Sequence, residues 1–125
     1  MKKRIKSFGY AGRGISMVFR SEANMKIHIT IAILVISCGF FFKISILEWM
    51  LCLICFSIVI GAEMMNTAIE CIVDLVSPNH HILAGKAKDI AAGAVLMCSM
   101  FSAIVGLIIF IPKGWTFLQH IFDYL

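Results

Sequence analysis

Residues 61–74, Gly-Ala-Glu-Met-Met-Asn-Thr-Ala-Ile-Glu-Cys-Ile-Val-Asp, decide how the rest of the chain is organised. They follow a long apolar run and place polar side chains at offsets of 0, 3, 7 and 11, namely Glu63, Asn66, Glu70 and Asp74. A helix turns by ~100° per residue, so the later three offsets return to within roughly 60° of the first. We therefore predict one helix that carries three carboxylates and an amide along a single stripe.

The composition places the chain among integral membrane proteins. Of its 125 residues, 61% are hydrophobic and only 14% are charged, and the mean hydropathy is +0.97. Soluble domains of this size are about half apolar. The five cysteines all lie among apolar residues, and the Cys52-x-x-Cys55 pair has no neighbouring His. We therefore expect reduced, packed thiols rather than redox or zinc chemistry.

The predicted fold class is all-α integral membrane, in a single domain over residues 1–125. Residues 1–21 mix basic and apolar side chains with three glycines, which favours an amphipathic helix on the membrane surface; a polybasic anchor for anionic lipid is the alternative. Apolar stretches predict three transmembrane helices, over residues 22–43, 46–75 and 84–111. Pro78 separates the second from the third. Pro112 is expected to end the third span, leaving residues 112–125 as a tail.

The basic residues predict the orientation. Of the eleven Lys and Arg residues, seven precede Ile27 and two (Lys86 and Lys88) lie at the start of the third span, against one at each of the two opposite ends. Since cytoplasmic loops carry the excess of basic residues, we expect a multi-pass protein of the cytoplasmic (inner) membrane with its N-terminus in the cytoplasm. The second span then extends into the cytoplasm, where its acidic stripe meets the start of the third.

Ionisable groups at the edge of a span are functional candidates because they are costly there. Glu63 is the deepest carboxylate and lies where a lipid headgroup hydroxyl would lie, so it is a candidate general base. Glu22 and Glu70 offer the hard oxygen ligands that Mg²⁺ accepts when it carries nucleotide phosphates. Lys88, beside Asp89, supplies a cation for phosphate oxygens. These groups together predict phosphoryl transfer, without a P-loop or a GxGxxG motif.

Two non-enzymatic interpretations stay open from the residues alone. In a non-catalytic assembly or regulatory protein, Asn66 and Thr67 would serve as hydrogen-bonding contacts between helices. In a small proton or ion pathway, the carboxylates would form a relay. The third span carries no charge between residues 90 and 111, which disfavours the pathway.

Two motifs resemble the signature of the small bacterial membrane lipid kinases, the family of prokaryotic diacylglycerol kinase and undecaprenol kinase. They are residues 63–70, Glu-Met-Met-Asn-Thr-Ala-Ile-Glu, followed by Val73-Asp74, and residues 87–96, Ala-Lys-Asp-Ile-Ala-Ala-Gly-Ala-Val-Leu. The resemblance covers nearly the whole chain. It implies a surface helix and three transmembrane helices, assembled as a homotrimer whose active sites are shared between neighbouring subunits.

The same resemblance implies roles for individual residues. Glu63 matches the catalytic base, Asn66 the asparagine beside it, and Glu22 and Glu70 the glutamates that hold Mg²⁺. Further residues match the ATP site, namely Tyr10, Asn79, His80, His81, Lys88 and Asp89.

The implied substrates are ATP and a lipid alcohol, and no nucleic acid is expected to bind. Residues 22–28 resemble the undecaprenol kinase branch more than the diacylglycerol kinase branch, because Asn24 and His28 are typical of the former. Undecaprenol is therefore the favoured acceptor, with diacylglycerol as the alternative.

Overall fold

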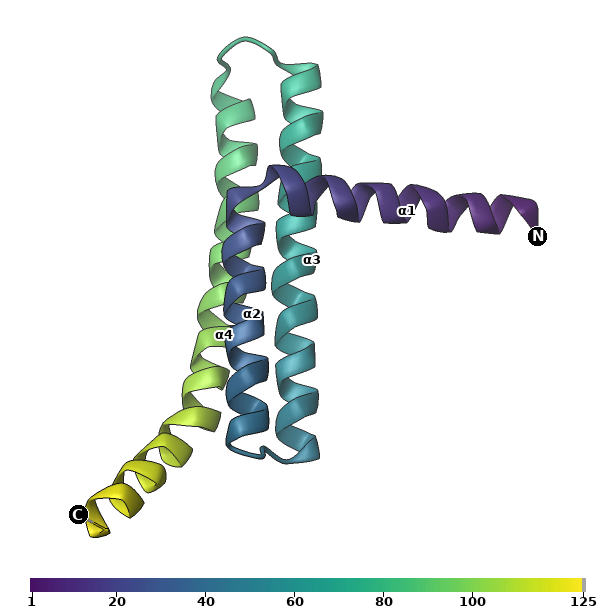
Figure 1. Cartoon of the computed structure of the whole chain (residues 1–125). Helices are drawn as coiled ribbons and strands as arrows, with labels where there is room; N and C mark the ends of the chain where they lie inside the picture. Colours follow the sequence, from purple (N-terminus) through teal and green to yellow (C-terminus); the bar gives the residue numbers. More distant parts are fainter. Residues whose placement is uncertain (125) are drawn as a thin grey trace.

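Residues 1–124, which the computed structural model describes, form four α-helices. They are α1 (Lys2–Ser21), α2 (Ala23–Phe41), α3 (Ile46–Val76) and α4 (Ile82–Asp123). The last three run side by side as a bundle, whereas α1 points away from it (Figure 1). The turn between α3 and α4 lies beyond the level of α1, so the ends of both helices extend past it.

Three of the described helices, α2, α3 and α4, are long and apolar enough to cross a membrane. A helix rises 1.5 Å per residue, so the 19 residues of α2 span about 28 Å, close to the ~30 Å of a bilayer's hydrocarbon core. Large apolar side chains such as Ile33, Leu53 and Ile108 are exposed on the outside of the bundle. They require lipid or another chain around them. The predicted all-helical class with three candidate membrane spans is confirmed.

The turn between α2 and α3 is fixed by a few residues. Lys43 has a φ of +49°, the left-handed conformation that reverses a chain in a short space. Ser45 then caps α3: its hydroxyl accepts a hydrogen bond from the Glu48 amide at 3.2 Å, and the Glu48 carboxylate accepts one from the Ser45 amide at 2.8 Å. Such a capping box fixes the start of a helix. Lys113 of α4 pairs with the same carboxylate at 3.1 Å, which ties α4 to this turn.

An apolar core lies at this end of the bundle. Ile44, Cys52 and Ile109 are buried together, with aromatic side chains packed around them. Cys52 therefore has the packing role expected from the sequence, and all five cysteines are free. Gly39 is buried beside Trp49, whose ring also lies 5.0 Å from that of Phe40.

Gly39→Ala is expected to destabilise the bundle. A Cβ atom there would lie 2.7 Å from Cη2 of Trp49 and 3.1 Å from Cδ1 of Ile44. Both distances are too short for van der Waals contact, so we expect a cost of about 1–3 kcal/mol from overpacking, measured as thermal unfolding in detergent. Gly85→Ala is the matched control, because a Cβ atom on Gly85 would meet nothing within 4 Å in the described chain. Equal losses in the two variants would contradict the packing argument.

α4 is longer than predicted. It begins at Ile82, where the His81 imidazole accepts a hydrogen bond from the Leu83 amide, and it continues through Pro112 to Asp123. Proline removes one amide donor and clashes with the preceding turn, which can kink a helix without ending it. The segment after Pro112 bends away from the bundle (Figure 1). Leu125, the last residue of the predicted tail, lies outside the described residues.

Candidate active site

The side chains of the polar stripe of α3 become more exposed from Glu63 toward Asp74. The side chain of Glu63 is only 1% exposed, and Asn66 and Thr67 are also buried. One turn further on, Glu70 is half-buried, and Asp74 is exposed. The stripe therefore runs from an apolar interior to the aqueous end of the bundle, as the offsets in the sequence predicted.

Glu63 faces α2. Its Oε2 lies 3.6 Å from Nε2 of His28, and the two side chains are 1% and 15% exposed. The hydroxyl of Thr67 donates a hydrogen bond to the backbone carbonyl of Glu63 at 3.0 Å. This bond involves the main chain of α3 and does not involve the Glu63 carboxylate.

Several buried polar atoms at this level have no hydrogen-bond partner within residues 1–124. They are Nε2 of His28, Oε2 of Glu63, Oδ1 of Asn66 and Oγ of Ser99. An unpaired polar atom in an apolar interior costs free energy. The four atoms lie on α2, α3 and α4 and have unused hydrogen-bonding capacity.

Asn66 connects the buried part of the stripe to its aqueous end. Its Nδ2 donates a hydrogen bond to Oε1 of Glu70 at 3.1 Å. The bond orients the Glu70 carboxylate, and it leaves Oδ1 of Asn66 without a partner in the described chain.

The aqueous ends of α3 and α4 are joined by an ion pair. Nζ of Lys88 lies 2.5 Å from Oδ1 of Asp74. The ammonium group of Lys88 therefore points toward the stripe of α3. Asp74 thus links the end of α3 to the start of α4 through Lys88.

The remaining predicted residues near this end of the bundle form no hydrogen bond or ion pair with the stripe within residues 1–124. Glu22 joins α1 to α2 and accepts a hydrogen bond from the Ser21 hydroxyl at 3.2 Å. His81 caps α4, and three other residues are exposed, namely Asn79, His80 and Asp89.

Tyr10 lies apart from the other predicted residues. The guanidinium of Arg13 lies 4.7 Å from its ring centre. The twelve residues from Tyr10 to Glu22 correspond to about 18 Å of helix. Because α1 points away from the bundle (Figure 1), Tyr10 is displaced from the stripe of its own chain.

In the part of the chain that the structure describes, no group of three or more His, Cys, Asp or Glu side chains could hold a metal ion by itself. The predicted pair of metal ligands, Glu22 and Glu70, is a smaller set. Carboxylate oxygens are the chemistry that Mg²⁺ prefers, and two carboxylates suffice when phosphate oxygens and water complete the shell. The pair fits a metal that arrives with its nucleotide, and its role stays a prediction.

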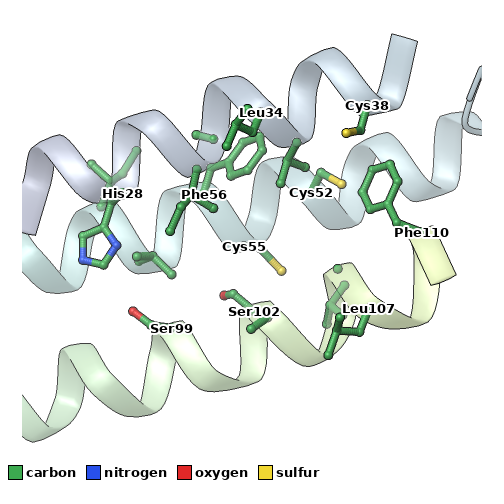
Figure 2. A pocket seen from close by; sticks show the side chains of 18 residues that line it. His28, Leu34, Cys38, Cys52, Cys55, Phe56, Ser99, Ser102, Leu107 and Phe110 are labelled. Atoms are coloured by element: carbon green, nitrogen blue, oxygen red, sulfur yellow. The ribbon is translucent and has the colours of Figure 1, made fainter. Parts of the chain in front are cut away.

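A cavity of about 400 Å³ lies between α2, α3 and α4 and is lined mainly by apolar side chains. Figure 2 shows His28 and Ser99 at one end of it, with Cys38 and Phe110 at the other. Ser99, Ser102 and Gly106 of α4 line this cavity. An apolar chamber therefore ends beside the buried carboxylate.

His28 was not predicted from the sequence to lie beside Glu63. It entered only through its resemblance to one branch of a family. The available signal was an imidazole near the start of an otherwise apolar span. Which helix it would face could not be known before the helices were packed.

Comparison with known proteins identifies the family. The family described as prokaryotic diacylglycerol kinase matches residues 9–110, most of the chain and all of the polar stripe. The chain belongs to this family. As a member of the prokaryotic diacylglycerol kinase family, it is a membrane lipid kinase, and the non-catalytic and ion-pathway interpretations are set aside.

Three relatives illustrate the range of the family. The chain is 45% identical to undecaprenol kinase of Bacillus subtilis over 113 residues, 90% of this chain and 92% of that protein. It is 36% identical to diacylglycerol kinase of Synechocystis over 85% of this chain, which is 61% of that longer protein. It is 27% identical to diacylglycerol kinase of Escherichia coli over 80% of this chain and 82% of that protein.

Proposed function

We propose that this kinase transfers the γ-phosphoryl group of ATP to the primary hydroxyl of undecaprenol at the cytoplasmic face of the membrane. The observation that carries the proposal is the buried Glu63 carboxylate with an unpartnered oxygen in the described chain, one helical turn before the Asn66–Glu70 hydrogen bond. Glu63, the base, lies at the apolar end of the stripe, where the lipid acceptor would arrive from the membrane. Glu70, a metal ligand, lies at the aqueous end, where ATP would arrive from water.

In this mechanism, Glu63 accepts the hydroxyl proton of the lipid alcohol as its oxygen attacks the γ-phosphorus. The bond between that phosphorus and the oxygen bridging to the β-phosphate breaks, and ADP leaves. Lys88 neutralises phosphate charge, and Asn66 orients Glu70. Glu22 and Glu70 would hold Mg²⁺, which when bound offsets the charge of the phosphates.

The cavity and the relatives support undecaprenol as the acceptor. The cavity beside His28 is lined by apolar side chains, which suits a hydrocarbon chain that carries a single hydroxyl. Among the relatives described above, the undecaprenol kinase has 45% identity, against 36% and 27% for the two diacylglycerol kinases.

The position of α1 supports a homotrimer with shared sites. Tyr10 is a predicted nucleotide contact, yet it lies along a helix that leaves its own bundle (Figure 1). Large exposed apolar side chains cover α2, α3 and α4. Tyr10 would therefore serve the site of a neighbouring subunit. The excess of basic residues at the N-terminus and before α4 supports a cytoplasmic location for the sites.

A competition assay tests the choice of acceptor. The purified protein in mixed micelles would receive labelled ATP and Mg²⁺, with undecaprenol and diacylglycerol at equal concentration. We expect label chiefly in undecaprenyl phosphate. Label chiefly in phosphatidic acid would overturn the acceptor, and label in neither lipid would overturn the proposed reaction.

A further inference from the structure

His28 of α2 and Glu63 of α3 bring two ionisable side chains together in the interior of the bundle, where they are 15% and 1% exposed. Nε2 of His28 on α2 lies 3.6 Å from Oε2 of Glu63 on α3. Neither atom has another hydrogen-bond partner within residues 1–124. Ser99 of α4 faces the same end of the cavity (Figure 2), and it carries no charge. The imidazole is thus the one ionisable group shown beside the proposed base.

The distance of 3.6 Å between Nε2 of His28 and Oε2 of Glu63 is slightly too long for a hydrogen bond. Hydrogen bonds between nitrogen and oxygen span about 2.7–3.2 Å, so a movement of about 0.5 Å would form one here. An ionised carboxylate only accepts hydrogen bonds, so Nε2 of His28 must be the donor. Catalytic hydrogen bonds are often long in the free enzyme and shorten when the substrate binds.

We infer that His28 is a positioning residue for Glu63. Its Nε2–H holds Oε2 of the carboxylate from across the α2–α3 interface and leaves Oε1 for the proton of the lipid hydroxyl. The inference rests on the proposed function, in which Glu63 is the base. It assigns to α2 the hydrogen-bond donor that orients the Glu63 carboxylate.

A positioning role follows from the freedom of the Glu63 side chain. The bond from Thr67 holds only the main-chain carbonyl of Glu63, so the side-chain torsions are not fixed by it. A carboxylate that rotates spends part of its time turned away from the hydroxyl. Misplacement of a reacting group by about 1 Å can lower a rate by about 100-fold.

Three substitutions at His28 test this inference. The amide nitrogen of Gln can occupy the position of Nε2, that of Asn reaches only the position of Nδ1, and Leu has no donor. We expect His28→Gln to retain kcat within about threefold and His28→Asn and His28→Leu to lose about 10- to 100-fold, with the KM for ATP unchanged in all three. Thr30→Ala, an exposed residue of the same helix, is the control with full activity.

The results separate this inference from the proposed function. If wild-type protein is active and His28→Leu equals it, or if His28→Gln is no better than His28→Leu, the positioning role is overturned. A readout without turnover is the ¹⁵N NMR spectrum of the His28 imidazole. We expect it to change in Glu63→Leu and not in Thr30→Ala; an unchanged spectrum in Glu63→Leu would overturn the pairing even if no lipid were phosphorylated.

Discussion

Glu63→Gln is expected to lower the rate of lipid phosphorylation by about 100- to 10,000-fold, the contribution of a general base. Gln has the size of Glu and can still accept a hydrogen bond from His28, but it cannot take the proton of the attacking hydroxyl. The initial rate of label transfer from ATP to lipid in mixed micelles measures the effect. Because the side chain is 1% exposed and already lacks a hydrogen-bond partner in the described chain, the neutral amide is expected to leave the fold intact.

The control for this substitution is Cys71→Ala, an exposed position on the same helix. We expect both variants to match wild type in helix content and in the size of the detergent complex, and only Glu63→Gln to lose activity. A Glu63→Gln protein that retains wild-type activity would remove Glu63 from the reaction.

Glu70→Gln is expected to lower kcat by about 100- to 1,000-fold, the scale of losing one electrostatic contact to a transferring phosphoryl group. The substitution keeps an oxygen that accepts the bond from Asn66, observed at 3.1 Å, but it removes a charge from the metal pair. We therefore expect the Mg²⁺ concentration for half-maximal rate to rise as well. A titration of the rate with Mg²⁺ at saturating ATP measures both effects.

Glu48→Gln is the matched control for the metal assignment. Glu48 lies on the same helix at the opposite end of the bundle, where it pairs with Lys113. We expect this variant to have the Mg²⁺ dependence of wild type. An unchanged Mg²⁺ dependence in Glu70→Gln, or an equal shift in Glu48→Gln, would refute the assignment of Glu70 as a metal ligand.

The helices and the polar stripe could be predicted because local sequence determines them. Long apolar runs and the turns around Lys43 and Pro78 define α2, α3 and the start of α4. The offsets between Glu63, Asn66 and Glu70 determine a shared helical face whatever surrounds it. The order of burial along that face follows from where the apolar run ends.

The rest depends on packing between helices, which a single sequence does not specify. The approach of His28 to Glu63 requires a particular rotation of α2 against α3. The cavity beside Ser99 exists because α2, α3 and α4 leave a space there. Pro112 predicted an end of the helix, but α4 continues through it to Asp123, because a proline can kink a helix as well as end it.

In the proposed reaction, the buried carboxylate of Glu63 on α3 activates a lipid hydroxyl for attack on ATP. The most direct test follows label from γ-labelled ATP into undecaprenol, with wild type and Glu63→Gln measured in parallel, with and without Mg²⁺. We expect label in undecaprenyl phosphate only for wild type with Mg²⁺. Equal label from both proteins, or none from wild type, would contradict it.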